Sequence, residues 1–148
     1  MTVFRNVVLS TFFLVFSCAY ADAARYVGTA ACKDCHEGEY ERFVKHSKKA
    51  GSWHSVERMA SKLTAEELAG CYACHTTGYG KGGFVNHEAT PHLADVGCES
   101  CHGPGGDHVA NGDAASIGKP DMKTCEGCHD ASRVRSFGYK PLLHSGAH

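Results

Sequence analysis

Cys98-Glu99-Ser100-Cys101-His102 is one of four pentapeptides in this chain of 148 residues that share the pattern Cys-x-x-Cys-His. The other three begin at Cys32, Cys71 and Cys125, and no two of the four have the same pair of intervening residues. Two thiols at this spacing can form thioether bonds to the two vinyl groups of one porphyrin, and the imidazole that follows can bind its iron. The pattern therefore predicts covalently attached c-type haem at four places.

The predicted attachment residues are Cys32, Cys35, Cys71, Cys74, Cys98, Cys101, Cys125 and Cys128, and the predicted proximal iron ligands are His36, His75, His102 and His129. The ninth cysteine, Cys18, lies in a segment that we expect to be removed, so no thiol is left for a disulfide. Zinc is the main alternative, because Cys-x-x-Cys pairs also build tetrahedral zinc sites. Zinc sites do not require a histidine directly after the second cysteine, and here one follows in all four motifs, which favours haem.

The first 21 residues have the features of a secretory signal peptide. Arg5 supplies the positive charge, residues 7–16 form an almost continuous apolar run, and Ala19-Tyr20-Ala21 resembles a cleavage site, although cleavage up to residue 24 fits equally. The apolar run is too short to span a bilayer. A lipid anchor on Cys18 is the less favoured alternative. The sequence thus predicts export to the periplasm, or to the cell surface beyond it.

The mature chain, residues 22–148, has the size of a single domain but few apolar side chains. Only 16 of its 127 residues are Leu, Ile, Val or Phe, well below the fraction of about a fifth under which disorder is expected. Four porphyrins would supply the missing apolar surface. We therefore expect a mainly α fold with much irregular loop, a small multihaem cytochrome c wrapped around four haems, and an unfolded apo form. The net charge is near zero and there is no basic run, so nothing indicates nucleic-acid binding.

Local patterns predict the positions of several helices and loops. Helical periodicity predicts helices over residues 37–49 and 52–62, with Ser52 as the N-cap of the second. Thr64-Ala65-Glu66-Glu67 is a capping box that begins a short helix leading into the second motif. The glycine-rich segments 76–83 and 103–106 predict irregular loops.

Histidine is far more abundant than the motifs require. Eleven are present, and the seven outside the motifs are His46, His54, His87, His92, His108, His144 and His148. A second imidazole on the open side of a haem iron is the obvious use for them. Methionine is the alternative ligand, but Met59 lies on an apolar helical stripe and Met122 in a polar turn, where packing or exposure is the simpler interpretation. We expect mostly bis-histidine haems, which have lower potentials than His/Met haems.

Three stretches resemble the tetrahaem cytochrome c554 family of periplasmic electron carriers. They are Tyr26-Val27-Gly28, the run from Cys74 to Gly80, and the run from Gly97 to Gly105 that is followed closely by His108-Val109. The resemblance extends over essentially the whole mature chain. It implies that the haems form closely stacked pairs, that most irons have two histidine ligands, and that the haem of the second motif can lack a distal ligand.

The resemblance also ranks the distal histidines. It makes His108 the best candidate, because His108 matches the family in its local context. The apolar C-terminal tail offers His148 or, failing it, His144. The helices after the first motif offer His54 or His46. Two further candidates have no secure counterpart in the family, and these are His87 and His92. Either both of these histidines are exposed, or one of them is the distal ligand of the fourth haem iron.

These features predict electron transfer: a carrier that passes single electrons along four close haems between periplasmic or membrane redox proteins. Irons with two histidine ligands cannot bind substrate, so we do not expect an enzyme. Two alternatives are kept. A second haem without a distal ligand could reduce nitric oxide or peroxide, although no motif has the lysine of the related nitrite reductases. Subunits could also stack into a haem wire, with spare histidines such as His46 or His87 binding iron in a neighbouring subunit.

Overall fold

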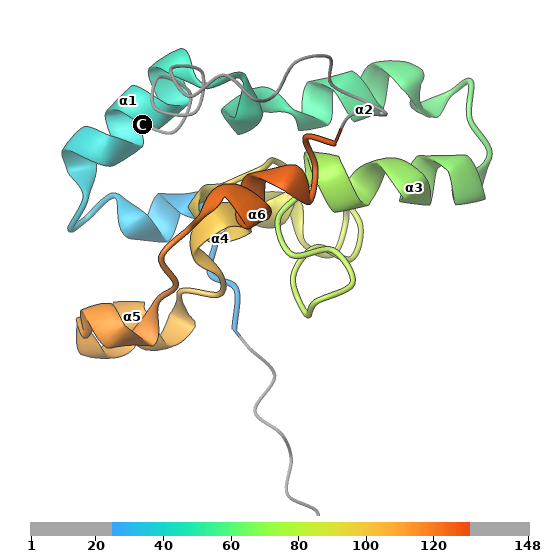
Figure 1. Ribbon diagram of the computed structural model, residues 1–148. Helices are drawn as coiled ribbons and strands as arrows, with labels where there is room; N and C mark the ends of the chain where they lie inside the picture. Colours follow the sequence, from blue (N-terminus) through green and yellow to red (C-terminus); the bar gives the residue numbers. More distant parts are fainter. Residues whose placement is uncertain (1–24, 131–148) are drawn as a thin grey trace, which may run out of the picture.

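The computed structural model describes residues 25–130 of the chain. In this part every regular element is a helix and no strand is present, which confirms the expected mainly α fold with much irregular loop (Figure 1). The α-helices are α1 (Glu37–His46), α2 (Trp53–Ala60), α3 (Ala65–His75), α4 (Cys98–His102), α5 (Gly106–Asn111) and α6 (Met122–Glu126). Short 3-10 turns are η1 (Thr29–Cys32), η2 (Lys48–Gly51), η3 (Pro91–Leu93) and η4 (Ala114–Ser116).

Several sequence-based predictions fall outside the described residues. They concern the signal peptide, Cys18, and the C-terminal tail with His144 and His148. The predictions for these residues are therefore neither confirmed nor contradicted. None of the helices between residues 25 and 130 is both long and apolar enough to cross a membrane.

The helices α1 and α2 lie along one side of the molecule, and the short helices α4, α5 and α6 lie away from that side (Figure 1). In Figure 1, α1 and α2 follow one another along one side of the molecule, and α3 runs back beside α2, which it contacts. The short helix α4 contacts η1. This arrangement brings helical turns that are far apart in the sequence next to one another.

The two helices predicted after the first motif form, but both end earlier than expected. Helix α1 stops at His46 because Ser47 is extended (φ −88°, ψ 123°), and its hydroxyl accepts a hydrogen bond from the N–H of Lys49 that begins η2. Helix α2 ends at Ala60, and Ser52 precedes it without capping it. The Ser52 hydroxyl instead donates to the carbonyl oxygen of His75, 2.9 Å away, so the capping role expected of it is wrong.

The capping box predicted before the second motif is confirmed. The Thr64 hydroxyl accepts a hydrogen bond from the N–H of Glu67 (3.3 Å), and the Glu67 carboxylate accepts one from the N–H of Thr64 (2.9 Å). These hydrogen bonds from Thr64 lower the pKa of Glu67. The start of α3, which carries the second motif in its last turns, is therefore fixed by two reciprocal bonds.

The apolar core of the described part is small and lies among α2, α3 and the loop that follows α3. Its centre is Phe84, Leu93 and Ala94, against which Tyr26, Trp53, Tyr72 and Tyr79 pack as partly buried side chains. Several large apolar side chains are left exposed by the packing of the polypeptide: Val44, Met59, Val85, Val109 and Met122. So much uncovered apolar surface fits a protein whose interior requires a further apolar group.

The loop after α3 is irregular, as predicted, and it is anchored at two places. Gly78 has a φ of +71°, and a Cβ on it would lie 2.6 Å from the ring of Tyr26, so the close approach of the aromatic ring requires glycine. Thr77 is 2% exposed. Its hydroxyl donates to the carbonyl oxygen of Asp95 (2.6 Å), accepts from the N–H of Gly97 (2.9 Å) and bonds the Ser100 hydroxyl (3.0 Å). This hydroxyl joins the loop to the third motif.

Candidate haem sites

The second and third motifs lie in helices, and the first and fourth each close a helix-like turn. The second motif is the end of α3, and the third is the whole of α4. In the first and fourth motifs the N–H of the histidine bonds the carbonyl oxygen of the first cysteine, at 2.9 Å in both His36 and His129. One helical turn places residues i, i+3 and i+4 on the same side. In every motif the two thiols and the imidazole therefore share one face, as attachment to a single porphyrin requires.

The thiols themselves are available for attachment. All eight motif cysteines are free, with no disulfide among them, and none is fully buried. No group of three or more metal-binding side chains that could hold a metal ion is found between residues 25 and 130.

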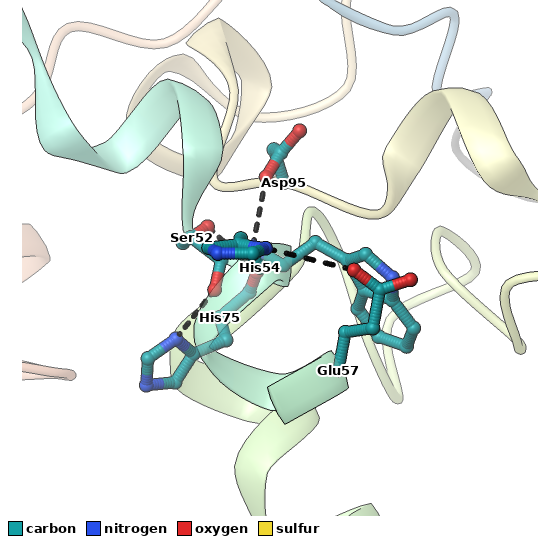
Figure 2. A network of polar contacts seen from close by, with 6 residues as sticks. Ser52, His54, Glu57, His75 and Asp95 are labelled. Atoms are coloured by element: carbon teal, nitrogen blue, oxygen red, sulfur yellow. Dashed lines mark hydrogen bonds and ion pairs between the residues drawn. The ribbon is translucent and has the colours of Figure 1, made fainter. Parts of the chain in front are cut away.

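Three histidine rings are oriented by main-chain carbonyl groups (Figure 2 for His75). The Nδ1 of His75 lies 3.2 Å from the carbonyl oxygen of Ser52, that of His102 lies 3.0 Å from Gly118, and that of His108 lies 2.9 Å from Asp113. A carbonyl oxygen only accepts, so in each ring Nδ1 carries the proton and Nε2 carries the lone pair. Metal-bound histidines typically have this tautomer and this kind of partner.

Two hydrogen bonds join His75 and Ser52. The Ser52 carbonyl accepts from the imidazole, and the Ser52 hydroxyl donates to the His75 carbonyl (2.9 Å). The same hydroxyl accepts from the N–H of Val96 (2.9 Å), and the N–H of Trp53 donates to the Asp95 carboxylate (2.8 Å). Figure 2 shows this network between the start of α2, the second motif and the segment before the third.

The imidazoles of His36 and His108 face each other, although they are 72 positions apart in the chain. Their ring centroids are 6.1 Å apart and their planes differ by 23°. The proximal histidine of the first motif and the best distal candidate from the sequence therefore lie near each other.

The remaining distal candidates in the described part lie on the surface. His54 is exposed on α2, 3.6 Å from the Glu57 carboxylate (Figure 2). His46 is the exposed last residue of α1. His87 stacks on Trp53, with ring centroids 4.9 Å apart, and His92 packs against Gly28. Within residues 25–130, no ring contact like that of His36 with His108 joins any of these four histidines to the imidazole of a motif.

Motifs that are distant in the sequence meet through their cysteines. The thiols of Cys32 and Cys98 are hydrogen bonded to each other; this bond lowers the pKa of Cys98 to about 7 and raises that of Cys32. The thiols of Cys74 and Cys128 are also hydrogen bonded, and burial raises the pKa of Cys128 to about 11. The first motif thus lies against the third, and the second against the fourth.

The third and fourth motifs are also close to each other. Burial raises the pKa of Cys101, with a smaller contribution in the same direction from the nearby Cys125 thiol. The positive charge of Lys49 lies near both motifs: it opposes the rise at Cys101, and at His129 it adds to the lowering of the pKa that burial causes. All four motifs therefore belong to one connected cluster.

Sequence reasoning missed one residue of this cluster. Glu99 is only 2% exposed, and its carboxylate accepts hydrogen bonds from the N–H groups of Val27, Gly28 and Gly105. In the sequence it is one of two glutamates that directly follow the first cysteine of a motif, the other being Glu126, which is exposed. No local signal distinguishes them, because the burial of Glu99 depends on contacts with distant segments.

Comparisons with known proteins agree with this geometry. The family described as "Cytochrome c554 and c-prime" matches residues 31–103, which contain the first three motifs. Among curated proteins the chain is similar to cytochrome c-554 of Nitrosomonas europaea, with 32% identity over 123 aligned residues, covering 73% of this chain and 52% of that protein. The chain thus spans about half the length of this relative. No solved structure matches the chain. From the motifs, their helical geometry and these matches, we conclude that the chain belongs to the cytochrome c554 family.

Proposed function

We propose that this protein is an exported cytochrome that holds four c-type haems and carries single electrons between periplasmic or membrane redox proteins. The observation that supports this most is the closeness of the four motifs, through the thiol pairs Cys32–Cys98 and Cys74–Cys128 and the electrostatic influence of Cys125 on Cys101. Cofactors attached at adjoining motifs would be adjacent, which short-range electron exchange requires. Membership of a cytochrome c family agrees with electron transfer as the general activity.

The residues that would hold each haem are the two cysteines and the histidine of its motif. Bound haem iron supplies reversible one-electron oxidation and reduction. The protein's own contribution is to fix the imidazoles, as the carbonyl groups of Ser52 and Gly118 do for His75 and His102. We assign His108 as the partner of His36 from the separation of their rings. Distal roles for the other candidates, including His54 and His148, remain proposals that rest on the family resemblance.

The proposed location rests on the first 21 residues, whose charge and apolar run are those of a secretory signal. Residues 22–148 would then form one domain, completed by haem attachment outside the cytoplasm. The redox partners are proposed only as a class, because the similar cytochrome is about twice as long and its partners need not be shared.

The test is a haem count and a turnover measurement on the protein purified from the periplasm. Intact mass should give four haems for one mature chain. The reduced protein should pass electrons to an oxidised carrier protein, and the oxidised protein should accept them from a reduced one, without consuming a small molecule. Mass with zinc or without haem would contradict the proposal. A spectral shift on adding carbon monoxide, together with reduction of nitric oxide, would favour the reductase instead.

A further inference from the structure

The carboxylate of Glu99 lies between two segments that are distant in the chain. Oε1 accepts from the N–H groups of Val27 (3.0 Å) and Gly105 (2.7 Å), and Oε2 accepts from those of Val27 (3.1 Å) and Gly28 (2.7 Å). Both oxygens act only as acceptors, which is the behaviour of an ionised carboxylate. Three main-chain N–H dipoles therefore hold the charge of a side chain that is almost completely buried.

The bonded segment on one side is residues 25–28, which we call the N-terminal strap. The strap also forms two hydrogen bonds with the start of α5. The Arg25 guanidinium donates to the carbonyl oxygen of Gly106 (2.7 Å), and the N–H of Gly106 donates to the carbonyl oxygen of Arg25 (3.0 Å). A Cβ on Gly106 would lie 2.6 Å from the Arg25 side chain, so the two segments are in close contact. Glu99 is thus enclosed by the strap, by α4 and by the start of α5.

Main-chain N–H groups, and not a cation, are the partners that the structure gives this carboxylate between residues 25 and 130. The ion pairs Arg42–Glu39 and His54–Glu57 do not involve it. The charge acts on its surroundings: burial raises the pKa of Tyr26, and the adjacent Glu99 carboxylate raises it further. The thiols of Cys32 and Cys98 also lie within its field. A buried negative charge, held by main-chain N–H groups, is therefore fixed beside the first cysteines of the first and third motifs.

We propose that Glu99 is a positioning residue that locks the N-terminal strap onto the third motif and, by its charge, lowers the reduction potentials of the haems attached at the first and third motifs. Reduction adds an electron to a site, and a buried negative charge nearby disfavours that addition, since it is poorly screened by solvent. The potential of a bound iron is sensitive to net charge and burial in its surroundings. This inference rests on the proposed function only in that the motifs carry haem.

The chain contains a matched control for this charge. Glu126 occupies the same place in the fourth motif, directly after its first cysteine, but its side chain is exposed and makes no hydrogen bond or ion pair with residues 25–130. Solvent screens an exposed charge much more strongly than a buried one. Glu99→Gln and Glu126→Gln thus make the same chemical change at equivalent positions in two environments.

The experiment is a spectroelectrochemical titration of the haem-loaded protein with small mediators, preceded by a haem count by mass. In Glu99→Gln two of the four midpoint potentials should rise, by about 59 mV each, which corresponds to a tenfold change in the ratio of reduced to oxidised iron for a one-electron couple. Glu126→Gln should leave all four potentials as they are in the parent. Equal potentials in Glu99→Gln and the parent would overturn the inference.

Glu99→Asp separates the charge from the hydrogen bonds. Aspartate keeps the charge but is one methylene too short to reach all three N–H groups, so the potentials should stay low while the temperature of unfolding falls. If Glu99→Asp raised the potentials as much as Glu99→Gln, displaced backbone rather than charge would be the cause, and the inference would be wrong. If Glu99→Gln fails to mature, Glu99→Asp is compared with the parent alone, and potentials raised in Glu99→Asp would overturn the inference. The proposed function fails separately, if a parent protein with measurable potentials does not exchange electrons with carrier proteins.

Discussion

Single imidazoles in this protein are oriented by the main chain. The rings of His75 and His102 donate from Nδ1 to carbonyl oxygens of other segments, and that of His108 donates to Asp113, just after its own helix. Substitution of the residue that supplies the carbonyl leaves that oxygen in place. Ring orientation is therefore protected against many point mutations and depends on the positions of the segments themselves.

Replacing His108 with alanine should convert one low-spin iron to the high-spin state, because it removes the imidazole that faces His36 at 6.1 Å. Electron paramagnetic resonance of the oxidised, haem-loaded protein measures this change. Val109→Ala is the control: Val109 is the exposed neighbour of His108 and has no group that binds iron, so its loss should leave the spin states of the parent. An unaltered spectrum for His108→Ala would remove it from the ligand set.

Thr77→Val should destabilise the protein by about 1–3 kcal/mol, because it leaves the buried N–H of Gly97 and the carbonyl of Asp95 without the hydroxyl. Thermal unfolding of the haem-loaded protein, followed by circular dichroism, gives the loss. Thr77→Ser keeps the hydroxyl and should lose much less. Equal losses in the two variants would show that packing, and not hydrogen bonding, is the role of this side chain.

At the scale of elements, α3 is fixed at its start by the capping box and carries the second motif at its end. Thr64→Ala should cost about 1 kcal/mol of stability at neutral pH. The bond from the Thr64 N–H, which the variant keeps, and the bond from its hydroxyl, which the variant loses, both lower the pKa of Glu67. The share that comes from the hydroxyl is present above the ordinary carboxyl pKa and is lost as the pH falls through the lowered value, so the difference in stability between Thr64→Ala and the parent, measured by denaturant titration, should shrink in acid.

Two glycines of the loop after α3 provide a matched pair of substitutions. Gly78 and Gly80 both have a φ of +71°, but a Cβ on Gly78 meets the Tyr26 ring, whereas one on Gly80 meets nothing within 4 Å. Gly80→Ala should cost about 1–2 kcal/mol through backbone strain alone. Gly78→Ala should cost about 1–3 kcal/mol more, because the ring must move. Equal unfolding temperatures for the two variants would contradict the contact.

Helix positions show what local sequence can and cannot predict. The capping box at Thr64 was predictable, since both of its hydrogen bonds connect residues three apart. The end of α1 was not, because the extended Ser47 belongs to a turn that continues into η2 and does not break the apolar pattern. Ser52 was expected to cap its own helix, but its hydroxyl bonds the distant His75, and no local pattern signals that choice.

At the scale of the whole molecule, the chemistry of the site was predictable and its assembly was not. Each Cys-x-x-Cys-His motif acts within a single helical turn, so five consecutive residues indicate attachment. The contacts between motifs, such as Cys32 with Cys98, connect residues 66 positions apart. Such contacts, and the burial of Glu99 between them, depend on how the loops place the helices. No local sequence pattern indicates that placement.

The chain without haem should not fold. Buried apolar side chains in the described part are few, with Phe43, Val56, Phe84, Leu93 and Ala94 as the core, and this is too little to offset the conformational entropy of ordering. Far-ultraviolet circular dichroism of protein produced without haem attachment should show little helix and no cooperative thermal transition. The haem-loaded protein is the control. A compact apo protein with cooperative unfolding would contradict this dependence on haem.

The two hydrogen bonds between Ser52 and His75 have a mechanical consequence. The carbonyl that orients the ring belongs to Ser52, the residue directly before α2. A partner protein that displaced α2 would therefore change the orientation of the His75 imidazole. If His75 holds a haem, the orientation of its ring would influence the iron. Docking at a surface helix would in this way be sensed at a cofactor that the partner never touches.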